Sequence, residues 1–540
     1  MLFTHDYWAP TMEVGLYRPL VTTSYALNYA FAERSPRGYH LTNIAMHGLV
    51  SVLVWALYMR LTADPCVAAA AGLLFAAHAA HTEVVANVAG RAELLGALFF
   101  LISLLLVLRY RDTPRGGLYA LCLGSYLLAL LSKESTVTLV GVIFLYDCVY
   151  GRERDPGLVA RLRGALRRGW PLYAGYVLVT LVYLGIRAMA LGADAALPHP
   201  AALDNPLVSL DLPWRILNAL QVAFHYLWLL CFPLQLSYDY SYNAIPLIGS
   251  LVDPHAWGVL ALCTVTVAVV VWSYRSGREL FFALGFYFIT FSVVSNLLVL
   301  IGTIMGERLV YVPSVGFCLA LVLALRGLCR RIPLAPGVAQ TVFVTVCALI
   351  VALHGLRTLD RNPDWSRTEQ LYLHDVEIVP DSAKALNNAG KVHQDQGRHA
   401  QALQEFARAL EIEPTYRMPV INQAYSLSSL GRVDEAMALL DGEIRRGSRE
   451  PFVYNNLGYL LVESEIDLAR GVALLEKANE LKPNDPDILD SLGWAYFRQG
   501  RLDDAYSLLA RSLRINDWSP SSPSRRAHLA ALERALGRNR

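Results

Sequence analysis

The sequence predicts an all-α protein in two parts, a polytopic helical membrane domain followed by a soluble α-solenoid. Of its 540 residues, 55% are hydrophobic and only 17% are charged, which is too apolar for an ordinary soluble enzyme. Up to about residue 356, apolar runs of roughly 15 to 22 residues follow one another, near the length that crosses a ~30 Å hydrocarbon layer. From about residue 380 the composition is that of soluble helices, and marker residues recur at a fixed spacing.

The apolar runs of the first part predict membrane-spanning helices. They lie near 41–60, 65–80, 93–108, 117–131, 136–150, 170–190, 255–273, 280–300, 309–325 and 338–355. The stretch 214–236 is also apolar and could be another span, a re-entrant helix or an interfacial helix.

Arginine residues indicate which helix ends face the cytoplasm, because short cytoplasmic loops collect Lys and Arg. Four clusters lie at helix ends: Arg109, Arg111 and Arg115; Arg152, Arg154, Arg161, Arg163, Arg167 and Arg168; Arg275 and Arg278; Arg326, Arg330 and Arg331. Alternation then places the following segments outside: 1–40, 78–93, 191–253, 301–308 and everything after 356. This requires that 214–236 does not cross the membrane, which favours a re-entrant or surface helix there.

The excess of arginine and alanine hints at a GC-rich bacterial genome, so we expect a multi-pass inner-membrane protein whose C-terminal part is periplasmic.

Three kinds of marker recur every 34 residues in the second part. They are Asn388, Asn422 and Asn456; Gly397 and Gly431; and Pro380 and Pro414. This is the period of the tetratricopeptide repeat, in which each repeat is a pair of helices. We expect about four repeats, at 382–415, 416–449, 450–484 and 485–518, the third imperfect around ESEIDLARG. Such a stack has a concave groove that binds extended peptide or a partner protein.

These patterns give five predicted segments. They are an external loop at 1–40, the transmembrane domain at 41–356, a linker at 357–381, the repeats at 382–518 and a capping helix or tail at 519–540. The net charge of +2 gives no basic field for nucleic acid. The eight cysteines show no CxxC spacing, so neither a disulfide framework nor a zinc site is expected.

Ionisable residues at the outer ends of the predicted spans are candidates for a functional site. His78, His81, Glu83, Arg91 and Glu93 lie between two apolar runs, where an unpaired charge costs several kcal/mol, about 3 or more. An equally weighted alternative is an interfacial hairpin whose charges only mark the membrane boundary. The HxxH spacing also suggests a metal, but a fixed fourth ligand is missing and we expect none.

More such residues occur in segments predicted to lie on the same outer side. They are Asp6, Arg18, Lys133, Glu134, Asp239, Glu307 and Arg308. Together they predict a polar, outward-facing pocket above a helical bundle, with carboxylates for proton transfer and Arg or Lys for an anionic ligand.

Seven blocks of sequence in order carry a resemblance. They are HDYWAP with YRPLVTTSYALNY, GYHLTNIAMHGLV, FAAHAAHTEVVANVAGRAELLGALFFLISLL, LLSKESTVTLVGVIFLYD, LSYDYSYNAIPLI, SNLLVLIGTIMGERLVYVPSVGFCLA and RTLDRNPDWSRTEQLY. This series resembles the TMTC family, the transmembrane and tetratricopeptide-repeat O-mannosyltransferases, in a bacterial version. The resemblance implies a GT-C-like glycosyltransferase that takes mannose, or another hexose, from a polyprenyl-phosphate carrier. It would transfer the sugar, with inversion, to Ser or Thr hydroxyls of proteins on the external face.

This chemistry needs a carboxylate that accepts the hydroxyl proton and cations that stabilise the leaving phosphate. Asp6 and Glu83 are the candidate catalytic carboxylates. The candidate substrate-binding residues are His78, His81, Arg91, Lys133, Glu134, Asp239, Glu307, Arg308 and Tyr311. The lipid-linked sugar is the expected donor, an acceptor protein or peptide the expected partner of the repeats, and a divalent cation is compatible with the reaction.

The chain departs from the family pattern at its start. Members usually begin with a transmembrane helix followed by an acidic pair, whereas this chain begins at the HDYW block. We therefore expect either an upstream start or a shortened relative, and Asp6 aligns with the aspartate of that block and not with the pair.

Two other functions fit the same pattern. The first is a membrane-anchored tetratricopeptide scaffold without catalytic activity, and the second is a lipid flippase or sugar-carrier exporter. Glu83→Gln and Arg308→Ala should abolish sugar transfer only if the chain is the transferase.

Overall fold

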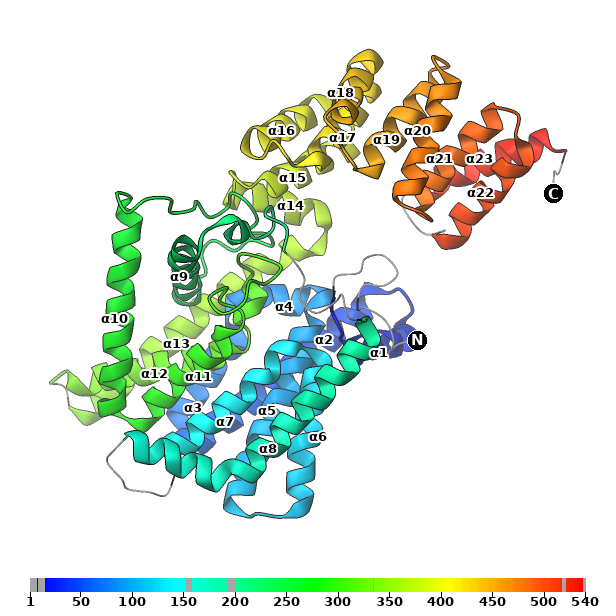
Figure 1. The fold of residues 1–540 in the computed structure, drawn as a ribbon. Helices are drawn as coiled ribbons and strands as arrows, with labels where there is room; N and C mark the ends of the chain where they lie inside the picture. Colours follow the sequence, from blue (N-terminus) through cyan, green and yellow to red (C-terminus); the bar gives the residue numbers. More distant parts are fainter. Residues whose placement is uncertain are drawn as a thin grey trace. The chain divides into compact units, whose positions relative to one another are not determined.

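The secondary structure of the described residues consists of helices joined by loops. The computed structural model describes Tyr7 and residues 15–151, 158–192, 200–333, 335–516 and 521–537, and it contains no strand among them. The chain divides into two compact units, Met1–Val379 and Pro380–Arg540 (Figure 1). The predicted all-α class is confirmed.

The first unit is a bundle of long apolar helices. Its α-helices are α1 (Pro19–Ala32), α2 (Pro36–Thr62), α3 (Pro65–Ala77), α4 (Thr82–Ala86), α5 (Arg91–Asp112), α6 (Gly116–Ser132), α7 (Leu139–Tyr150), α8 (Leu158–Leu191), α9 (Leu212–Cys231), α10 (Pro254–Ser276), α11 (Arg278–Ser292), α12 (Pro313–Arg331), α13 (Pro336–Arg361) and α14 (Thr368–Ile378). Each predicted apolar run therefore coincides with a helix.

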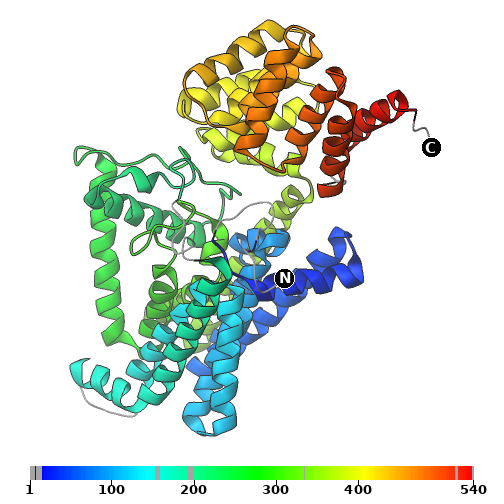
Figure 2. The ribbon, with the colours of Figure 1, turned by 45° about the vertical axis from the view of Figure 1, so that its right-hand side comes forward.

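Six helical stretches are long and apolar enough to cross a membrane. They are Pro36–Thr62, Val88–Asp112, Val159–Leu191, Pro254–Ser276, Pro313–Arg331 and Gly337–Ser366. A seventh is the pair Pro65–Ala77 and Ala79–Ala86, if the two are counted as one span with a bend of 48° between them. The 20 residues of α9 are long enough but are not among these spans. Figures 1 and 2 both show α10 at the edge of the bundle. Many of its apolar side chains, such as Trp257, Val265 and Val267, are exposed.

One predicted span ends earlier than expected. The apolar run 280–300 is helical only as far as Ser292, because the chain turns at Asn296, which has a left-handed φ of 59°. The Asn296 side chain donates to Thr303 O and Ile304 O and accepts from Ile301 N–H. These bonds give partners to backbone C=O and N–H groups of the loop, which has no helical hydrogen bonds to satisfy them.

The arginine-rich helix ends lie together at one end of the bundle (Figure 1). Ion pairs join α5 to α7 and α12 to α3, and guanidinium groups stack on aromatic rings of neighbouring helices. The pairs are Arg111 with Asp147, Arg326 with Asp64, Arg161 with Tyr274, Arg278 with Tyr150 and Arg331 with Trp272. These contacts join neighbouring helices at this end of the bundle.

Close helix packing in the bundle depends on one glycine of α12. A Cβ added at Gly316 would come within 2.6 Å of Tyr287 N and closer still to Ala283 O, both backbone atoms of α11. The helices therefore touch backbone to backbone here. Nearby, the Tyr58 hydroxyl of α2 donates to Val315 O at 2.6 Å.

Residues 357–379, which make up most of the predicted linker, belong to the first unit and are largely helical. Helix α13 continues to Arg361, and the 3₁₀ helix η7 (Asn362–Ser366) and α14 follow. Arg361 and Asp375 are buried, and Tyr238 N–H donates to Asp375 Oδ1 at 3.0 Å. Arg361 and Asp375 thus make contacts inside the first unit.

The second unit consists of helix pairs with the predicted repeat spacing. The pairs are α15 (Ala383–Asp395) and α16 (His399–Ile412), α17 (Arg417–Ser429) and α18 (Val433–Arg445), α19 (Pro451–Glu463) and α20 (Leu468–Leu481), and α21 (Pro486–Arg498) and α22 (Leu502–Ile515), followed by α23 (Ser522–Ala535). In three pairs the turn between the two helices contains a glycine with a left-handed backbone conformation. These are Gly397, Gly431 and Gly500, with φ of 75°, 78° and 80°. In the imperfect third repeat Glu465 adopts this conformation, with φ of 54°.

Candidate functional site

The polar stretch between the first apolar runs forms a bend fixed by two histidines. Helix α3 ends at Ala77, and the 3₁₀ helix η1 (Ala79–His81) leads into α4. His78 Nε2 donates to Leu230 O at 3.0 Å, and His81 Nε2 lies 2.9 Å from Ser314 Oγ. Both rings are almost fully buried. His78 and His81 therefore attach the bend to α9 and α12 and do not line an open pocket.

Glu83 and Arg308 form the central pair of the candidate site. Glu83 lies in α4 and is fully buried, whereas Arg308 lies in the 3₁₀ helix η6 (Glu307–Val310) and its side chain is 38% exposed. Glu83 Oε2 accepts from Arg308 N–H at 2.7 Å, and Oε1 forms an ion pair with Arg308 Nη1. Both carboxylate oxygens thus accept a hydrogen bond from Arg308, while the Arg308 side chain remains partly exposed.

Glu307 faces the opposite side of η6 and holds a loop. Its Oε1 accepts from Ser237 N–H at 2.7 Å and from the Tyr240 hydroxyl at 2.9 Å. Glu307 Oε2 is buried without a hydrogen-bond partner among the described residues. Burial and the nearby Glu83 carboxylate raise the pKa of Glu307 well above its usual range. A protonated Glu307 is neutral, which lowers the cost of burying it.

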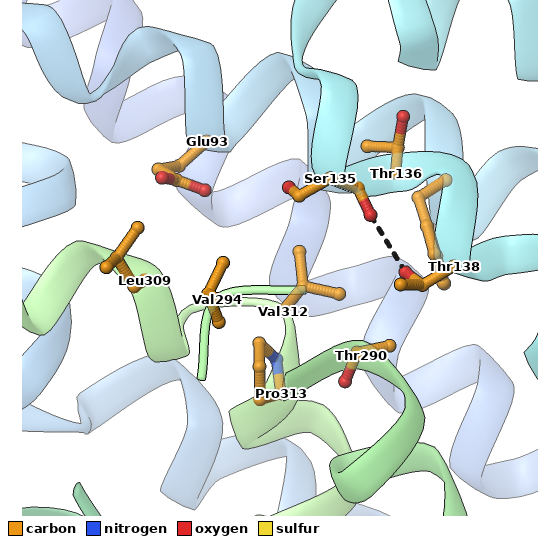
Figure 3. A pocket seen from close by; sticks show the side chains of 10 residues that line it. Glu93, Ser135, Thr136, Thr138, Thr290, Val294, Leu309, Val312 and Pro313 are labelled. Atoms are coloured by element: carbon orange, nitrogen blue, oxygen red, sulfur yellow. Dashed lines mark hydrogen bonds between the residues drawn. The ribbon is translucent and has the colours of Figure 1, made fainter. Parts of the chain in front are cut away.

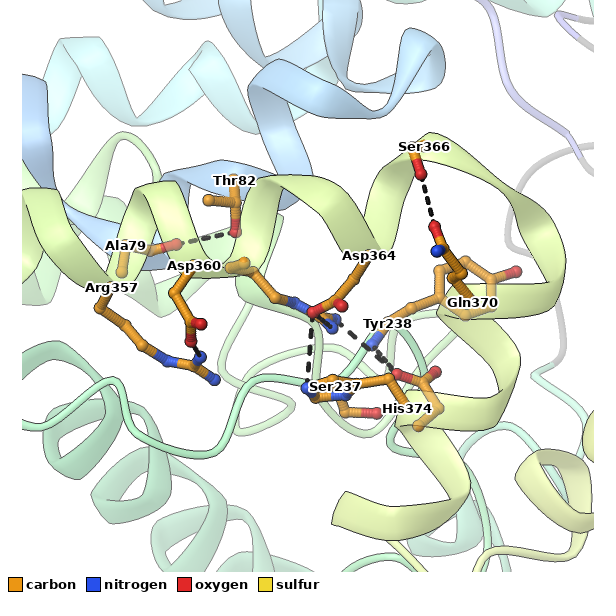
Figure 4. Close-up of polar contacts among 12 residues, drawn as sticks. Ala79, Thr82, Ser237, Tyr238, Arg357, Asp360, Asp364, Ser366, Gln370 and His374 are labelled. Carbon is orange, nitrogen blue, oxygen red and sulfur yellow. Dashed lines mark hydrogen bonds and ion pairs between the residues drawn. The ribbon is translucent and has the colours of Figure 1, made fainter.

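A second polar group fixes the same loop from the other side (Figure 4). Asp375 accepts from Tyr238 N–H, and Arg361 Nη1 donates to Asp364 Oδ2 at 2.9 Å. His374 Nε2 lies 3.5 Å from the same Asp364 oxygen. Burial raises the pKa of Asp375 to about 7. This group therefore connects α13 and α14 to residues 237–241.

Two further ion pairs lie beside the central pair. Lys133 pairs with Glu93 at the start of α5, and Arg18 holds Glu134 by two bonds of 2.7 and 3.1 Å. The charge of Lys133 also interacts with those of Glu83 and Arg308. The structure thus brings seven predicted residues into one charged cluster: Arg18, Glu83, Glu93, Lys133, Glu134, Glu307 and Arg308.

A small polar cavity lies next to Glu93 (Figure 3). It is lined in part by Ser135, Thr136, Thr138 and Thr290. Each threonine hydroxyl donates to a nearby backbone carbonyl, at 2.7 to 2.9 Å. The hydroxyl oxygens can therefore offer only lone pairs to the cavity, which suits a water molecule.

Other candidate residues make structural contacts outside the ion pairs of this cluster. Arg91 is fully buried; it donates to Asn43 Oδ1 at 2.9 Å and to Tyr39 O at 3.1 Å, and it stacks 4.8 Å from the Tyr25 ring centre. The buried Tyr311 hydroxyl lies 2.7 Å from His47 Nδ1. These contacts join helices. Separately, Asp239 Oδ1 accepts from Ser241 N–H at 2.7 Å and shapes its own loop. Asp6 lies outside the described residues.

An apolar hollow of about 530 Å³ borders the charged cluster. It lies against α9 and the end of α14, and its lining includes Trp228, Phe232, Leu234, Met305 and Tyr240. Tyr240 connects the two regions, because its hydroxyl bonds to Glu307. The volume falls within the range of ordinary small-molecule sites.

Comparisons with protein families and with known sequences find matches in both parts of the chain. Residues 194–267 match the family model described as Protein O-mannosyl-transferase TMTC, DUF1736, and residues 383–416 match the tetratricopeptide repeat. The chain is 28% identical to Protein O-mannosyl-transferase TMTC3 of Mus musculus, over 89% of this chain and 56% of that protein. It is 30% identical to Protein O-mannosyl-transferase TMTC4 of Homo sapiens, over 75% of this chain and 60% of that protein.

The chain thus spans 56% and 60% of the length of these two relatives. Among solved structures, a thermophilic TPR protein of Thermus thermophilus is 25% identical over 29% of this chain and 84% of that chain, with a TM-score of 0.27. The resemblance to the TMTC family is confirmed by the family model and by the relatives.

Proposed function

We propose that this chain is a membrane glycosyltransferase that transfers mannose from a polyprenyl-phosphate carrier to Ser or Thr hydroxyls of proteins on the external face. The names of its relatives support the reaction, and the charged cluster supplies groups that suit it. The observation that carries the proposal is the partly exposed side chain of Arg308, whose guanidinium is held by the buried carboxylate of Glu83.

Arg308 suits the leaving group of this reaction. The acceptor hydroxyl oxygen forms a bond to the anomeric carbon, while the bond from that carbon to the phosphate oxygen breaks and the phosphate keeps the electron pair. Guanidinium hydrogen bonds to phosphate are strong because both groups are charged. Arg308 is already oriented by Glu83, so it stabilises the developing charge without rearrangement.

The hydroxyl proton requires a separate acceptor. Glu83 suits this role poorly, because Arg308 occupies both of its oxygens. We therefore propose Glu83 as the residue that positions Arg308, and we keep Asp6 as the candidate proton acceptor. Asp6→Asn should then lower the rate of transfer while leaving donor binding unchanged.

The apolar hollow suits the isoprenoid chain of the carrier. It adjoins the charged cluster at Tyr240, and exposed aromatic side chains such as Trp228 and Phe232 border it. A lipid phosphate has the same arrangement, an apolar chain next to a charged head group. We propose that the carrier lies with its chain in the hollow and its phosphate near Arg308.

The proposal is tested by following labelled mannose from its polyprenyl-phosphate carrier to a Ser/Thr-containing peptide in membranes that contain the full chain. Glu83→Gln and Arg308→Ala should abolish transfer. Because Arg308→Ala leaves Glu83 buried without a counter-ion, the double variant Glu83→Gln/Arg308→Gln serves as a version without buried charge. Arg115→Ala, an exposed residue at the arginine-rich end, is the matched control. Unchanged transfer in the double variant would refute the site, and absence of transfer in the unaltered chain would favour the scaffold function.

A further inference from the structure

A separate cavity of about 270 Å³ lies at the arginine-rich end of the bundle, between the end of α12 and the start of α13. Its lining includes Arg326 and Arg330 of α12 and Gln340 of α13. The 19 residues of α12 rise about 28 Å, so the cavity lies far from Arg308, which precedes the start of that helix. Its volume equals that of about nine water molecules at ~30 Å³ each. A phosphate group and a small polar group attached to it fit this space.

Arg326 is held in one direction by two contacts. Its Nη1 pairs with Asp64 Oδ2, and its guanidinium carbon lies 5.9 Å from the centre of the Phe343 ring. Asp64 is itself fixed, because its Oδ1 accepts from Cys66 N–H at 3.0 Å and from Val67 N–H at 3.2 Å at the start of α3. A guanidinium has five N–H donors, so Arg326 has donors left for a ligand after it has paired with Asp64.

Arg330 lies one turn further along α12 and is exposed. Its side chain makes no ion pair, hydrogen bond or ring contact with any residue that the structure describes. The nearby carboxylates are already used in other ion pairs, which are Asp64 with Arg326, Asp112 with Arg60, Asp147 with Arg111 and Glu279 with Arg278. The cavity therefore has two guanidinium groups in its lining and an excess of positive charge, which suits a phosphate.

The depth of the cavity favours a lipid over a soluble anion. Helix α12 and the stretch Gly337–Ser366 are both long and apolar enough to cross a membrane. The cavity lies where the first ends and the second begins, which is the level of the lipid head groups. Ile332 borders the cavity and is 41% exposed, and Leu328, one turn earlier, is 59% exposed. A soluble anion would use the arginines and leave these apolar side chains uncovered, whereas a phospholipid would use both.

We propose that this cavity binds the head group of an anionic phospholipid. The phosphate accepts hydrogen bonds from Arg326 and Arg330, the Gln340 amide donates to an oxygen of the polar group beyond it, and the acyl chains lie against Leu328 and Ile332. Basic pockets between spanning helices are suited to anionic head groups because charge and apolar surface lie side by side. The inference goes beyond the proposed function and does not rest on it, because α12 separates this site from Arg308.

The test measures lipid binding to the purified, delipidated full chain in detergent by native mass spectrometry. Dioleoylphosphatidylglycerol and dioleoylphosphatidylcholine have the same acyl chains and differ in the net charge of the head group. The first molecule of the anionic lipid should bind at least about tenfold more tightly than the first molecule of the zwitterionic lipid. Equal binding of the two lipids would overturn the proposal. Displacement of the anionic lipid by an equal concentration of inorganic phosphate would assign the cavity to a soluble anion and would also overturn it.

Arg330→Gln is the most informative variant, because Arg330 has no partner within the described part of the protein and its loss should not disturb the fold. It should weaken binding of the anionic lipid roughly threefold to tenfold. Arg115→Gln removes the same charge from an exposed position at the same end and is the matched control, which should bind as the unaltered chain does. Equal binding by these two variants would contradict the proposal.

A second variant tests the cavity without changing its charge. Ala339 borders the cavity, and Ala339→Phe should fill it while both arginines remain. Binding of the anionic lipid should fall at least about threefold, with the melting temperature showing that the variant is folded. Undiminished binding by a folded Ala339→Phe variant would place the lipid elsewhere on the arginine-rich end and refute this site.

Discussion

Glu83 holds Arg308 at two points, accepting its backbone N–H at 2.7 Å and pairing with its guanidinium. The two residues are 225 positions apart in the chain, and their contact joins α4 to η6. The buried carboxylate fixes both the position and the direction of the exposed cation. Because Glu83 is fully buried, the contact is also important for stability.

Removing only the cation should therefore destabilise the fold. Arg308→Ala leaves Glu83 as a buried charge, which costs about 3 to 5 kcal/mol. The double variant Glu83→Gln/Arg308→Gln should recover most of this loss while remaining inactive. Thermal unfolding in detergent measures the difference. Equal melting temperatures for Arg308→Ala and the double variant would show that the pair does not act in this way.

Gly316 should be irreplaceable in α12, whereas Gly327 of the same helix should not. A methyl group at Gly316 would strike the backbone of α11, while at Gly327 it would meet nothing within 4 Å. We expect Gly316→Ala to destabilise by about 1 to 3 kcal/mol through overpacking. Gly327→Ala should be neutral or stabilising by up to about 1 kcal/mol. Melting temperatures of the two variants give the comparison, and similar losses for both would contradict the packing described.

Asp375 should make the stability depend on pH. Its pKa is about 7 in the folded protein and near 3.8 in an unfolded chain, so the folded state binds more protons between these values. Stability should fall as pH rises through this window, by up to about 1.4 kcal/mol per pH unit. Asp375→Asn should flatten the profile of melting temperature against pH between about 4 and 7. A slope as steep in the variant as in the unaltered chain would exclude this origin.

Arg91 should act through structure and not through the donor phosphate. Its guanidinium bonds to Asn43, Asn28 and Tyr39 O and stacks on Tyr25, and a lysine cannot reproduce this planar set of contacts. Arg91→Lys should lower stability by about 2 kcal/mol and leave the KM for the donor unchanged. A raised KM without loss of stability would instead return Arg91 to the substrate-binding residues.

Much of the fold follows from local sequence. The apolar runs predict the long helices of the bundle but not α1 or α14, which lie outside those runs. The 34-residue period predicts the repeat pairs, because hydrophobicity and spacing are local properties. The loop after Ser292 could not be predicted, since its conformation depends on hydrogen bonds of the Asn296 side chain. The buried contacts of Arg361 and Asp375 within 357–381 could not be predicted either, because Asp375 bonds to Tyr238, which is far away in the sequence.

The candidate site could be predicted in its members but not in their pairing. Sequence indicated that Glu83 and Arg308 lie on one side of the membrane, but it could not show that Arg308 occupies both oxygens of Glu83. The histidines His78 and His81 looked like site residues, yet their partners are Leu230 O and Ser314. Tyr240 and Asp375 were missed, although charged residues directly after the last apolar run were a signal for Asp375.

The central claim is that the cluster around Arg308 transfers mannose to a polypeptide hydroxyl. The most direct measurement uses the purified full chain, a polyprenyl-phosphate carrier with radiolabelled mannose and a Ser/Thr-containing peptide. The account predicts label on the peptide that alkaline β-elimination releases, and no label with the Glu83→Gln/Arg308→Gln variant. Undiminished labelling by that variant, while Arg115→Ala labels normally, would contradict the account.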